Sequence, residues 1–315
     1  MKVLANDGIH PLGKAALEAA GFTVVTEKVA QADLATALKD YDVLCVRSAT
    51  KVRRDLIDAA PHLRMIVRGG VGMDNIDVAY ATEKGILCAN TPASSSQAVA
   101  ELVVAQLFTL SRFLHESNRT MPTNGSTEFA NLKKAYEKGV QVQGKTLGIV
   151  GFGRIGQAVA RIALGCGMRV LPVDMYVSAA TLSLAPLQAP EGTAWNVTLE
   201  TIPMDAMLAE ADFITVHVPS GKIFGAEEIA KMKTGVRLIN TARGGVIDEN
   251  ALLAALDSSK VAAAALDVFE NEPTPLPALL AHPRISLTPH IGAATNEAQV
   301  NISLEMAELI IANVR

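Results

Sequence analysis

The chain has 315 residues, of which half are hydrophobic and 19% are charged, and its formal net charge is −4. This length favours two domains, and the apolar half of the residues is enough for two cores, which argues against a disordered chain. No basic block or stripe occurs, so neither nucleic acid nor a membrane surface is expected as a partner.

The absence of an export signal and the placement of the cysteines both predict a cytoplasmic protein. The first ten residues, MKVLANDGIH, contain polar residues where a signal peptide has its apolar core. No run of about 18 apolar residues predicts a transmembrane helix. The cysteines are far apart within apolar segments, which indicates reduced core thiols and neither disulfides nor a metal site; they are Cys45, Cys88 and Cys166.

The first 90 residues alternate between short apolar runs and helix-like segments. Strands are expected at 3–5, 22–25, 43–46, 65–67 and 86–88, and helices at 11–20, 33–38 and 53–60. Such alternation predicts a parallel sheet with right-handed crossovers. We therefore expect a small α/β domain, without a glycine-rich nucleotide motif of its own.

Two loops of this domain follow predicted strands and carry arginine. Val46-Arg47-Ser48 follows the strand at 43–46, and Arg68-Gly69-Gly70-Val71-Gly72 follows the strand at 65–67. Open α/β sheets bind ligands at the carboxyl ends of their strands. The two arginines would form a pocket for a carboxylate or phosphate, with loop N–H groups as further donors. Two solvated surface arginines are the alternative.

The alternation stops at Asn90-Thr91-Pro92. An apolar helix is expected at about 96–114, with the length and position of a connector between domains. Residues 118–144 are polar, with a helix-like piece at 129–138, and lead into the second domain.

Residues 145–174 are typical of a strand, a glycine-rich turn, a helix and a second strand. The turn GFGRIG, residues 151–156, is a G-x-G-x-x-G motif. Gly151 permits the tight turn, Gly153 lets the backbone approach a pyrophosphate, and Gly156 lets the helix pack against the strand. Asp174, 18 residues after Gly156, can accept the ribose 2′-hydroxyl and would repel a 2′-phosphate. The unit predicts a site for NAD rather than NADP; the alternative is a glycine-rich turn that only packs.

The chain is less regular after Asp174. Residues 175–190 carry no charge and include Pro186 and Pro190, which predicts a loop. This loop would either cover the adenosine end of the cofactor or be an inert insertion. Further on, helices are expected at 203–209 and 229–232, and strands at 213–218, 236–240, 263–268 and near 285.

Three polar side chains lie just beyond successive strands of this region: Arg243, Glu272 and His290. They therefore share the nucleotide-binding edge of one sheet. In a site that interconverts an alcohol and a ketone, the arginine binds the substrate carboxylate, the histidine takes the hydroxyl proton and the carboxylate orients the histidine. Taken singly, a solvated arginine, a capping acid and a turn histidine are alternatives. His217, within an apolar strand, is expected to be structural.

The motifs GFGRIG with its aspartate, NTARGGVID, LDVFENEP and TPHIGAAT resemble, in this order, the D-2-hydroxyacid dehydrogenase family. Within the family, VRSATKV, VRGGVGMDNID and PHIGAATNEAQ are most similar to the D-3-phosphoglycerate dehydrogenases. The resemblance implies that the Arg–Glu–His set is catalytic. It also implies a Rossmann-type doubly wound nucleotide domain at 93–294, inserted into a smaller flavodoxin-like α/β substrate domain formed by 1–92 and 295–315.

The resemblance further implies the residues that bind ligands. The substrate would be bound by Arg47, Arg68, Gly70, Val71, Gly72 and Asn90. NAD would be held by Gly151, Gly153, Arg154, Ile155, Gly156, Asp174, Val218, Thr241, Ala242, Arg243, Asp267, His290 and Gly292. Family members are commonly dimers joined through their nucleotide domains, so a homodimer is expected.

The activity implied by the resemblance is NAD-dependent oxidation of 3-phosphoglycerate to 3-phosphohydroxypyruvate, the first step of serine biosynthesis. A hydroxypyruvate or glyoxylate reductase is the alternative of the same class, and an NAD-sensing protein similar to a corepressor is the alternative of another class. Three departures from the family pattern stand out. Because the chain stops at Arg315, the resemblance leads us to expect no regulatory domain of the kind that some relatives have. The segment after His217 is short, and the span from Asp174 to His217 is long.

Overall fold

The computed structural model describes residues 1–184 and 194–314, which form two compact units. Unit 1 comprises Met1–Ala98 and Ala293–Arg315, and unit 2 comprises Val99–Gly292. The boundaries expected from the sequence, at 92 and 295, differ from these by a few residues. The first boundary lies further along because Ala98, near the start of helix α5 (Ser96–Ser111), packs into the core of unit 1.

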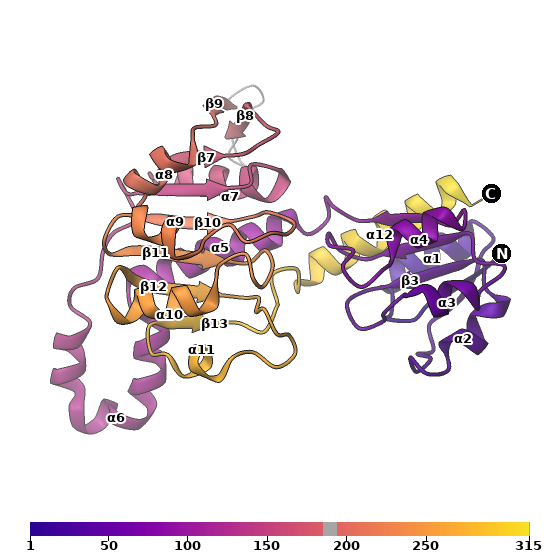
Figure 1. Ribbon diagram of the computed structural model, residues 1–315, viewed down its shortest axis with the longest axis horizontal. Helices are drawn as coiled ribbons and strands as arrows, with labels where there is room; N and C mark the ends of the chain where they lie inside the picture. Colours follow the sequence, from indigo (N-terminus) through magenta and orange to yellow (C-terminus); the bar gives the residue numbers. More distant parts are fainter. Residues whose placement is uncertain (185–193, 315) are drawn as a thin grey trace. The chain divides into compact units, whose positions relative to one another are not determined.

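Unit 1 is a five-stranded parallel sheet in the order β2-β1-β3-β4-β5, which is the flavodoxin order. Helices α1 and α12 pack on one face, and α2, α3 and α4 pack on the other (Figure 1). The strands are β1 (Lys2–Ala5), β2 (Thr23–Val25), β3 (Val43–Val46), β4 (Met65–Arg68) and β5 (Leu87–Asn90). The helices are α1 (Pro11–Ala19), α2 (Leu34–Ala37) with the short η1 (Leu38–Asp40), α3 (Arg54–Asp58), α4 (Val78–Glu83) and α12 (Asn296–Asn313).

The expected strands and helices of unit 1 are confirmed, with one helix missed. Helix α4 was not expected from the sequence because it is short and Ala81 is the residue that it buries, so no apolar periodicity marks it. Helix α12 packs closely on α1. A Cβ atom at Gly13 would lie 2.5 Å from the Ser303 carbonyl oxygen, so glycine is required at that crossing.

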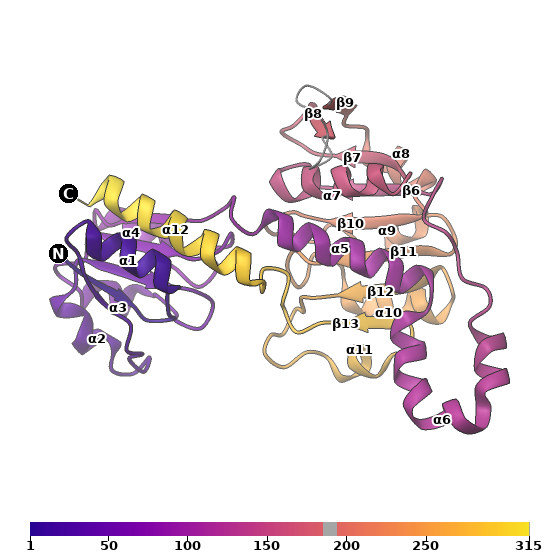
Figure 2. The ribbon, with the colours of Figure 1, turned by 180° about the vertical axis from the view of Figure 1, so that it is seen from behind.

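Unit 2 is a six-stranded parallel sheet in the order β13-β12-β11-β10-β6-β7. Helices α5 and α7 pack on one face, and α8, α9, α10 and α11 on the other (Figure 2). The chain passes from one side of β6 to the other, so the switch point of this doubly wound sheet lies between β6 and β10. The strands are β6 (Thr146–Val150), β7 (Arg169–Val173), β10 (Phe213–Val216), β11 (Val236–Asn240), β12 (Val261–Leu266) and β13 (Ile285–Leu287). The helices are α7 (Arg154–Gly165), α8 (Met204–Glu210), α9 (Ala226–Lys231), α10 (Glu249–Asp257) and α11 (Pro277–Ala281).

The helix expected at about 96–114 is confirmed as α5, which ends slightly earlier than expected. Helix α5 ends at Ser111, and Phe113 adopts a left-handed conformation with φ 54° before α6 (Leu114–Ala135) begins. The expectation that helix resumes only near 129 was wrong, because α6 already begins at Leu114. Helix α6 buries none of its residues, which fits its polar sequence. It projects from the sheet of unit 2 and has a kink at Glu128 (Figure 1). Within the described residues no single helix is long and apolar enough to cross a membrane; α5 and α6 pass that test only together, bent by 61°.

The loop expected at 175–190 is wrong over its middle part. Strand β8 (Ala179–Leu184) pairs antiparallel with β9 (Trp195–Glu200), and Leu182 is buried in the core that also contains α7. The sequence did not indicate β8 because small residues occupy its exposed positions. The alternation of buried and exposed side chains along the strand is therefore not visible as an alternation of apolar and polar residues. Pro186 and Pro190 lie outside the described residues. The paired strands β8 and β9 lie within the long span between Asp174 and His217.

Candidate active site

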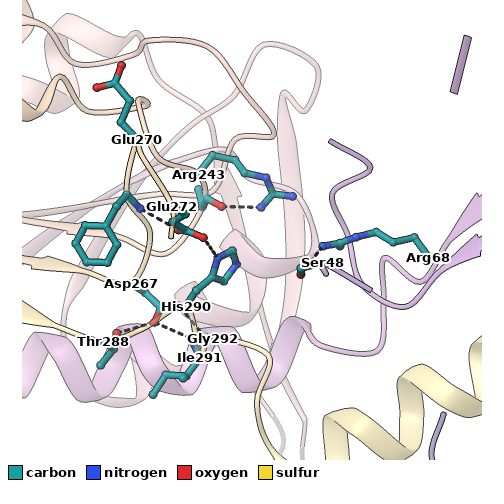
Figure 3. A network of polar contacts seen from close by, with 12 residues as sticks. Ser48, Arg68, Arg243, Asp267, Glu270, Glu272, Thr288, His290, Ile291 and Gly292 are labelled. Atoms are coloured by element: carbon teal, nitrogen blue, oxygen red, sulfur yellow. Dashed lines mark hydrogen bonds and ion pairs between the residues drawn. The ribbon is translucent and has the colours of Figure 1, made fainter. Parts of the chain in front are cut away.

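His290 and Glu272 form a hydrogen-bonded pair at the carboxyl edge of the sheet of unit 2 (Figure 3). His290 Nδ1 lies 2.8 Å from Glu272 Oε2, and Glu272 Oε1 accepts the Phe269 N–H at 3.0 Å. The two side chains are 47% and 37% exposed, so a ligand can reach them. Because Nδ1 is bound to the carboxylate, Nε2 is the ring nitrogen that can exchange a proton with a ligand.

Asp267 holds the loop that carries His290. This aspartate is 2% exposed, and its carboxylate accepts hydrogen bonds from Thr288 Oγ1 at 2.6 Å, from the Ile291 N–H at 2.8 Å and from the Gly292 N–H at 2.8 Å. His290 itself has φ 55°, a conformation that costs free energy for a residue with a side chain. The hydrogen bonds on both sides of His290 therefore keep its ring toward Glu272.

Arg243 follows β11, the strand next to β12. Asn240, the last residue of β11, fixes the start of this loop. Its side-chain amide donates to the Arg243 carbonyl at 2.9 Å and its amide oxygen accepts the Ala242 N–H at 3.0 Å. The Arg243 guanidinium donates to the Ala242 carbonyl at 2.6 Å. The three predicted catalytic side chains thus follow the neighbouring strands β11, β12 and β13, and Figure 3 shows them close to one another.

The glycine-rich turn fits a bound pyrophosphate. A Cβ atom at Gly151, where φ is 92°, would lie 2.6 Å from the His217 carbonyl oxygen, and one at Gly156 would lie 2.2 Å from the Gly151 carbonyl oxygen. Glycine is therefore required by the turn and by the packing of α7 on β6. A Cβ atom at Gly153, by contrast, would meet no heavy atom of the described residues within 4 Å. Helix α7 begins at Arg154, so its first N–H groups are directed at this open space.

Asp174 lies beside the glycine turn, directly after β7. Its Oδ2 accepts the Phe152 N–H at 2.6 Å, and its Oδ1 accepts the N–H groups of Tyr176 at 2.7 Å and Val177 at 3.0 Å. Partial burial acts to raise the pKa of Asp174, but the backbone N–H groups together outweigh burial and hold the pKa below its ordinary value. The carboxylate is therefore ionised at neutral pH, as the discrimination against a 2′-phosphate requires.

The remaining predicted cofactor residues also follow strands of unit 2. Val218 lies beyond β10, and its Cγ1 would be 3.3 Å from a Cβ atom at Gly151, which places it beside the glycine turn. Thr241 and Ala242 follow β11, and Gly292 follows β13. His217 is structural, as expected: burial lowers its pKa to about 3, and its Nε2 lies 3.1 Å from Thr215 Oγ1.

In unit 1, the two arginine loops lie together at the carboxyl edge of the sheet. Arg68 donates to Ser48 Oγ at 3.4 Å, which connects the loop after β4 with the loop after β3. Asn90 donates to the Val71 carbonyl at 2.5 Å and so fixes the glycine loop from β5. The Gly70 N–H is already bound to Thr91 Oγ1 at 2.8 Å. The predicted substrate residues are thus neighbours within unit 1.

Sequence reasoning missed Asp7, which organises the Arg47 loop. Asp7 Oδ2 accepts the N–H groups of Arg47 at 2.7 Å and Thr50 at 3.0 Å, and its Oδ1 accepts Thr50 Oγ1 at 2.8 Å. Asn75 donates to the carbonyl groups of the same two residues, at 2.7 Å each. Asp7 follows β1 directly, so the signal that could have found it is the position of an acid at the switch point between β1 and β3.

The fold and the two sites define a nucleotide-binding α/β protein with a redox-type set of polar residues. Residues 104–292 match the NAD binding domain of the D-isomer specific 2-hydroxyacid dehydrogenases. A D-3-phosphoglycerate dehydrogenase of Synechocystis sp. is 37% identical, over 98% of this chain and 53% of its own length. A hydroxypyruvate reductase of Thermotoga maritima is 42% identical, over 91% of this chain and 89% of its own length. The solved structure of a glyoxylate reductase from Paecilomyes thermophila has a TM-score of 0.80 and 31% identity, and the match covers 98% of this chain and 93% of that one.

The chain therefore belongs to the D-isomer specific 2-hydroxyacid dehydrogenase family, which confirms the resemblance found in the sequence. The Rossmann-type fold class is confirmed as well, and NAD is the cofactor of the matched domain. The chain spans about half the length of the phosphoglycerate dehydrogenase relative and most of the length of the hydroxypyruvate reductase relative.

Proposed function

We propose that this protein is an NAD-dependent dehydrogenase that oxidises 3-phosphoglycerate to 3-phosphohydroxypyruvate, which would make it the first enzyme of serine biosynthesis. The observation that carries the proposal is the hydrogen bond between His290 and Glu272, at the same sheet edge as a glycine turn that fits a pyrophosphate. A histidine held by a carboxylate beside a dinucleotide site has the chemistry of a proton acceptor in alcohol oxidation.

Each member of the set has one task. His290 takes the hydroxyl proton at Nε2, and the imidazolium that forms is stabilised by Glu272 at Nδ1. Arg243 binds the carboxylate of the substrate and polarises the oxygen of the reacting carbon. When bound, NAD would supply the hydride acceptor for that carbon. In the reverse direction the same histidine returns the proton to the carbonyl oxygen.

The cofactor residues are assigned from their places around the glycine turn and the strand ends. Gly153 with the first N–H groups of α7 would bind the pyrophosphate, and Asp174 would accept the 2′-hydroxyl of the adenine-side ribose. Asp267 is assigned a double role, because its carboxylate already holds the His290 loop. The further contacts of this proposal are made by Gly151, Arg154, Ile155, Gly156, Val218, Thr241, Ala242 and Gly292.

The substrate residues of unit 1 supply positive charge for a second anionic group. Arg47 and Arg68 follow neighbouring strands, and the backbone around Arg47 is fixed by Asp7 and Asn75. A preorganised arginine loses less entropy on binding a phosphate. Because the Gly70 N–H is engaged with Thr91, we assign the amide contacts to Val71 and Gly72, with Asn90 holding their loop.

The second candidate function is reduction of hydroxypyruvate or glyoxylate. It is favoured by the hydroxypyruvate reductase relative, which this chain covers over 89% of its length, whereas it covers 53% of the phosphoglycerate dehydrogenase. Both reactions use the same proton and hydride steps. They differ in whether the substrate brings a phosphate for the Arg47 loop.

The proposal includes a homodimer joined through unit 2 and a cytoplasmic location. Helix α6 supports the dimer because it buries none of its residues and exposes Met121 and Phe129, which are 42% and 60% exposed. The location is supported by the three cysteines, which are free thiols. Sedimentation equilibrium of the purified chain tests the dimer: a dimer whose dissociation constant rises in Phe129→Asp supports it, and a monomer refutes it.

Turnover of the His290→Ala variant tests the proposed activity. We expect the wild-type protein to consume NADH with phosphohydroxypyruvate, and His290→Ala to lose at least about 100-fold in kcat while it binds NADH as before, because a general acid–base contributes about that much. His62→Ala, which removes an exposed histidine, is the matched control. Undiminished turnover by His290→Ala would refute the proton role. A wild-type protein that binds NADH without turnover of any 2-oxo acid would instead support the corepressor-like alternative.

A further inference from the structure

Glu249 connects the loop of Arg243 to the loop of Glu272. It is the first residue of α10, the helix that follows the Arg243 loop directly. The side chain lies in the interior, since the residue is 7% exposed, and its Oε1 accepts the Glu270 N–H at 2.8 Å. Glu270 lies two residues before Glu272 in the loop after β12. A buried carboxylate at the start of α10 thus binds the backbone of the loop that carries Glu272.

The two loops also touch through their backbones. A Cβ atom at Gly244 would lie 1.9 Å from the Phe269 carbonyl oxygen and 2.5 Å from the Glu270 nitrogen. Residue 244 can therefore carry no side chain without displacing the turn at 269–272. The turn has successive N–H groups bound by two carboxylates: Phe269 donates to Glu272, and Glu270 donates to Glu249. The hydrogen bond to Glu249 fixes the start of the turn, two residues before Glu272.

Capping of α10 does not explain a buried glutamate at this position. Asp248 already caps the helix, because its Oδ1 accepts the Ala251 N–H at 2.9 Å. Burial raises the pKa of Glu249, and the carboxylates of Glu270 and Asp248 act in the same direction, while the Glu270 N–H opposes them. A carboxylate kept in a costly place indicates a task that a surface acid cannot perform.

We propose that Glu249 is a positioning residue for Glu272: it holds the 269–272 turn so that the Glu272 carboxylate meets His290 Nδ1. The proposal rests on the proposed function, because the pair that Glu249 positions is the proton-transferring pair of that reaction. Without Glu249 the Glu270 N–H loses its partner, the turn loosens, and the His290 ring is no longer held toward the substrate.

The proposal is tested by Glu249→Ala and Glu249→Gln in the full chain. We expect Glu249→Ala to lower kcat by about 10- to 100-fold, as small misplacements of catalytic groups do, with the dissociation constant of NADH within about twofold of wild type. Glu249→Gln should stay within about threefold of wild type in kcat, because the glutamine oxygen can still accept the Glu270 N–H. The matched control is Glu228→Ala. Glu228 also accepts one backbone N–H at a helix start, that of Gly225 at 2.9 Å, but in α9, and its loss should leave kcat unchanged.

A double-mutant cycle separates positioning from general stabilisation. In a Glu272→Ala background, Glu249→Ala should cost less than about threefold in kcat, since the side chain that it positions is already absent. A loss as large as in the wild-type background would overturn the proposal, as would equal losses in Glu249→Ala and Glu249→Gln. Thermal unfolding shows which variants fold, and Glu249→Asp, one methylene shorter, replaces Glu249→Ala if that variant does not. A wild-type protein without turnover overturns both this inference and the proposed function, whereas an active wild type with an unaffected Glu249→Ala overturns the inference alone.

Discussion

Gly153→Ala separates cofactor binding from folding more cleanly than any other change in the glycine turn. Gly153 has φ −75° and ψ −158°, an extended conformation that alanine also adopts. The added Cβ atom would meet no heavy atom of the described chain within 4 Å. The free energy of unfolding should therefore change by less than about 1 kcal/mol, because the gain from a less flexible unfolded chain is offset by alanine being a poorer N-cap of α7 than glycine.

The same methyl group would occupy the space assigned to the pyrophosphate. If NADH lies against Gly153, the backbone can no longer approach the phosphate oxygens, and hydrogen bonds from the start of α7 lengthen. We expect the dissociation constant of NADH to rise by about 10- to 100-fold, which corresponds to about 1.4 to 2.8 kcal/mol of binding free energy. One methyl group should thus weaken NADH binding while it leaves stability nearly unchanged.

The assay is fluorescence titration with NADH beside urea unfolding of the same preparations. Gly165→Ala is the matched control, because a Cβ atom there also meets no neighbour and the residue lies at the other end of α7; both affinity and stability should be kept. Gly156→Ala should lose about 2 kcal/mol or more of stability, since its Cβ atom would overlap the Gly151 carbonyl oxygen at 2.2 Å. Wild-type affinity in Gly153→Ala would refute the assigned pyrophosphate position, and a stability loss like that of Gly156→Ala would refute the open space.

Three further predictions concern substrate, cofactor and pH. Arg47→Ala should raise KM for phosphohydroxypyruvate at least about tenfold more than it raises KM for hydroxypyruvate in NADH-consumption assays. The reason is that a lost arginine–phosphate contact is worth more than about 1.4 kcal/mol. Equal increases in the two KM values would contradict a phosphate role. Asp174→Asn should narrow the preference for NADH over NADPH by about tenfold or more in kcat/KM, and an unchanged ratio would contradict the 2′-hydroxyl contact. Because the pKa of Asp174 is held below its ordinary value, its carboxylate stays ionised between about pH 6 and pH 9. The wild-type preference for NADH over NADPH should therefore not vary over this range. His217, with a pKa of about 3 in the folded chain, binds its proton near pH 6.5 only when unfolded, so its contribution to stability is complete above about pH 6.5 and is lost toward pH 3. Urea unfolding at about pH 7 and pH 5 should show His217→Gln losing about 2 kcal/mol less than wild type on acidification; equal losses would show that His217 is not the responsible group.

Most of the fold could be predicted from the sequence because strands of parallel sheets are apolar runs that periodicity detects. The five strands of unit 1 and the glycine unit from β6 to β7 are found in this way. The errors at α4 and α6 have a common cause. Helix α6 buries none of its residues and helix α4 buries little, so neither has the periodic apolar residues from which a helix is predicted.

The catalytic set could be proposed from the sequence for another reason. Binding sites of open α/β sheets lie at the strand ends, and each of Arg243, Glu272 and His290 follows a strand closely. The supporting residues were not accessible in this way. Asp7 and Glu249 act through hydrogen bonds to backbone 40 and 21 residues away in sequence, and no local pattern reports such a partner. Asp267 was expected from family resemblance as a cofactor residue, and its bonds to the His290 loop appear only in three dimensions.

The central claim is tested most directly by the rates of NADH consumption with phosphohydroxypyruvate, hydroxypyruvate, glyoxylate and pyruvate at equal concentrations. The proposed function predicts that phosphohydroxypyruvate is consumed with the highest kcat/KM, by about tenfold or more, because it alone brings a phosphate to the Arg47 loop. A higher kcat/KM for hydroxypyruvate or glyoxylate would contradict that claim, keep the His290–Glu272 chemistry and make the protein a reductase of unphosphorylated acids.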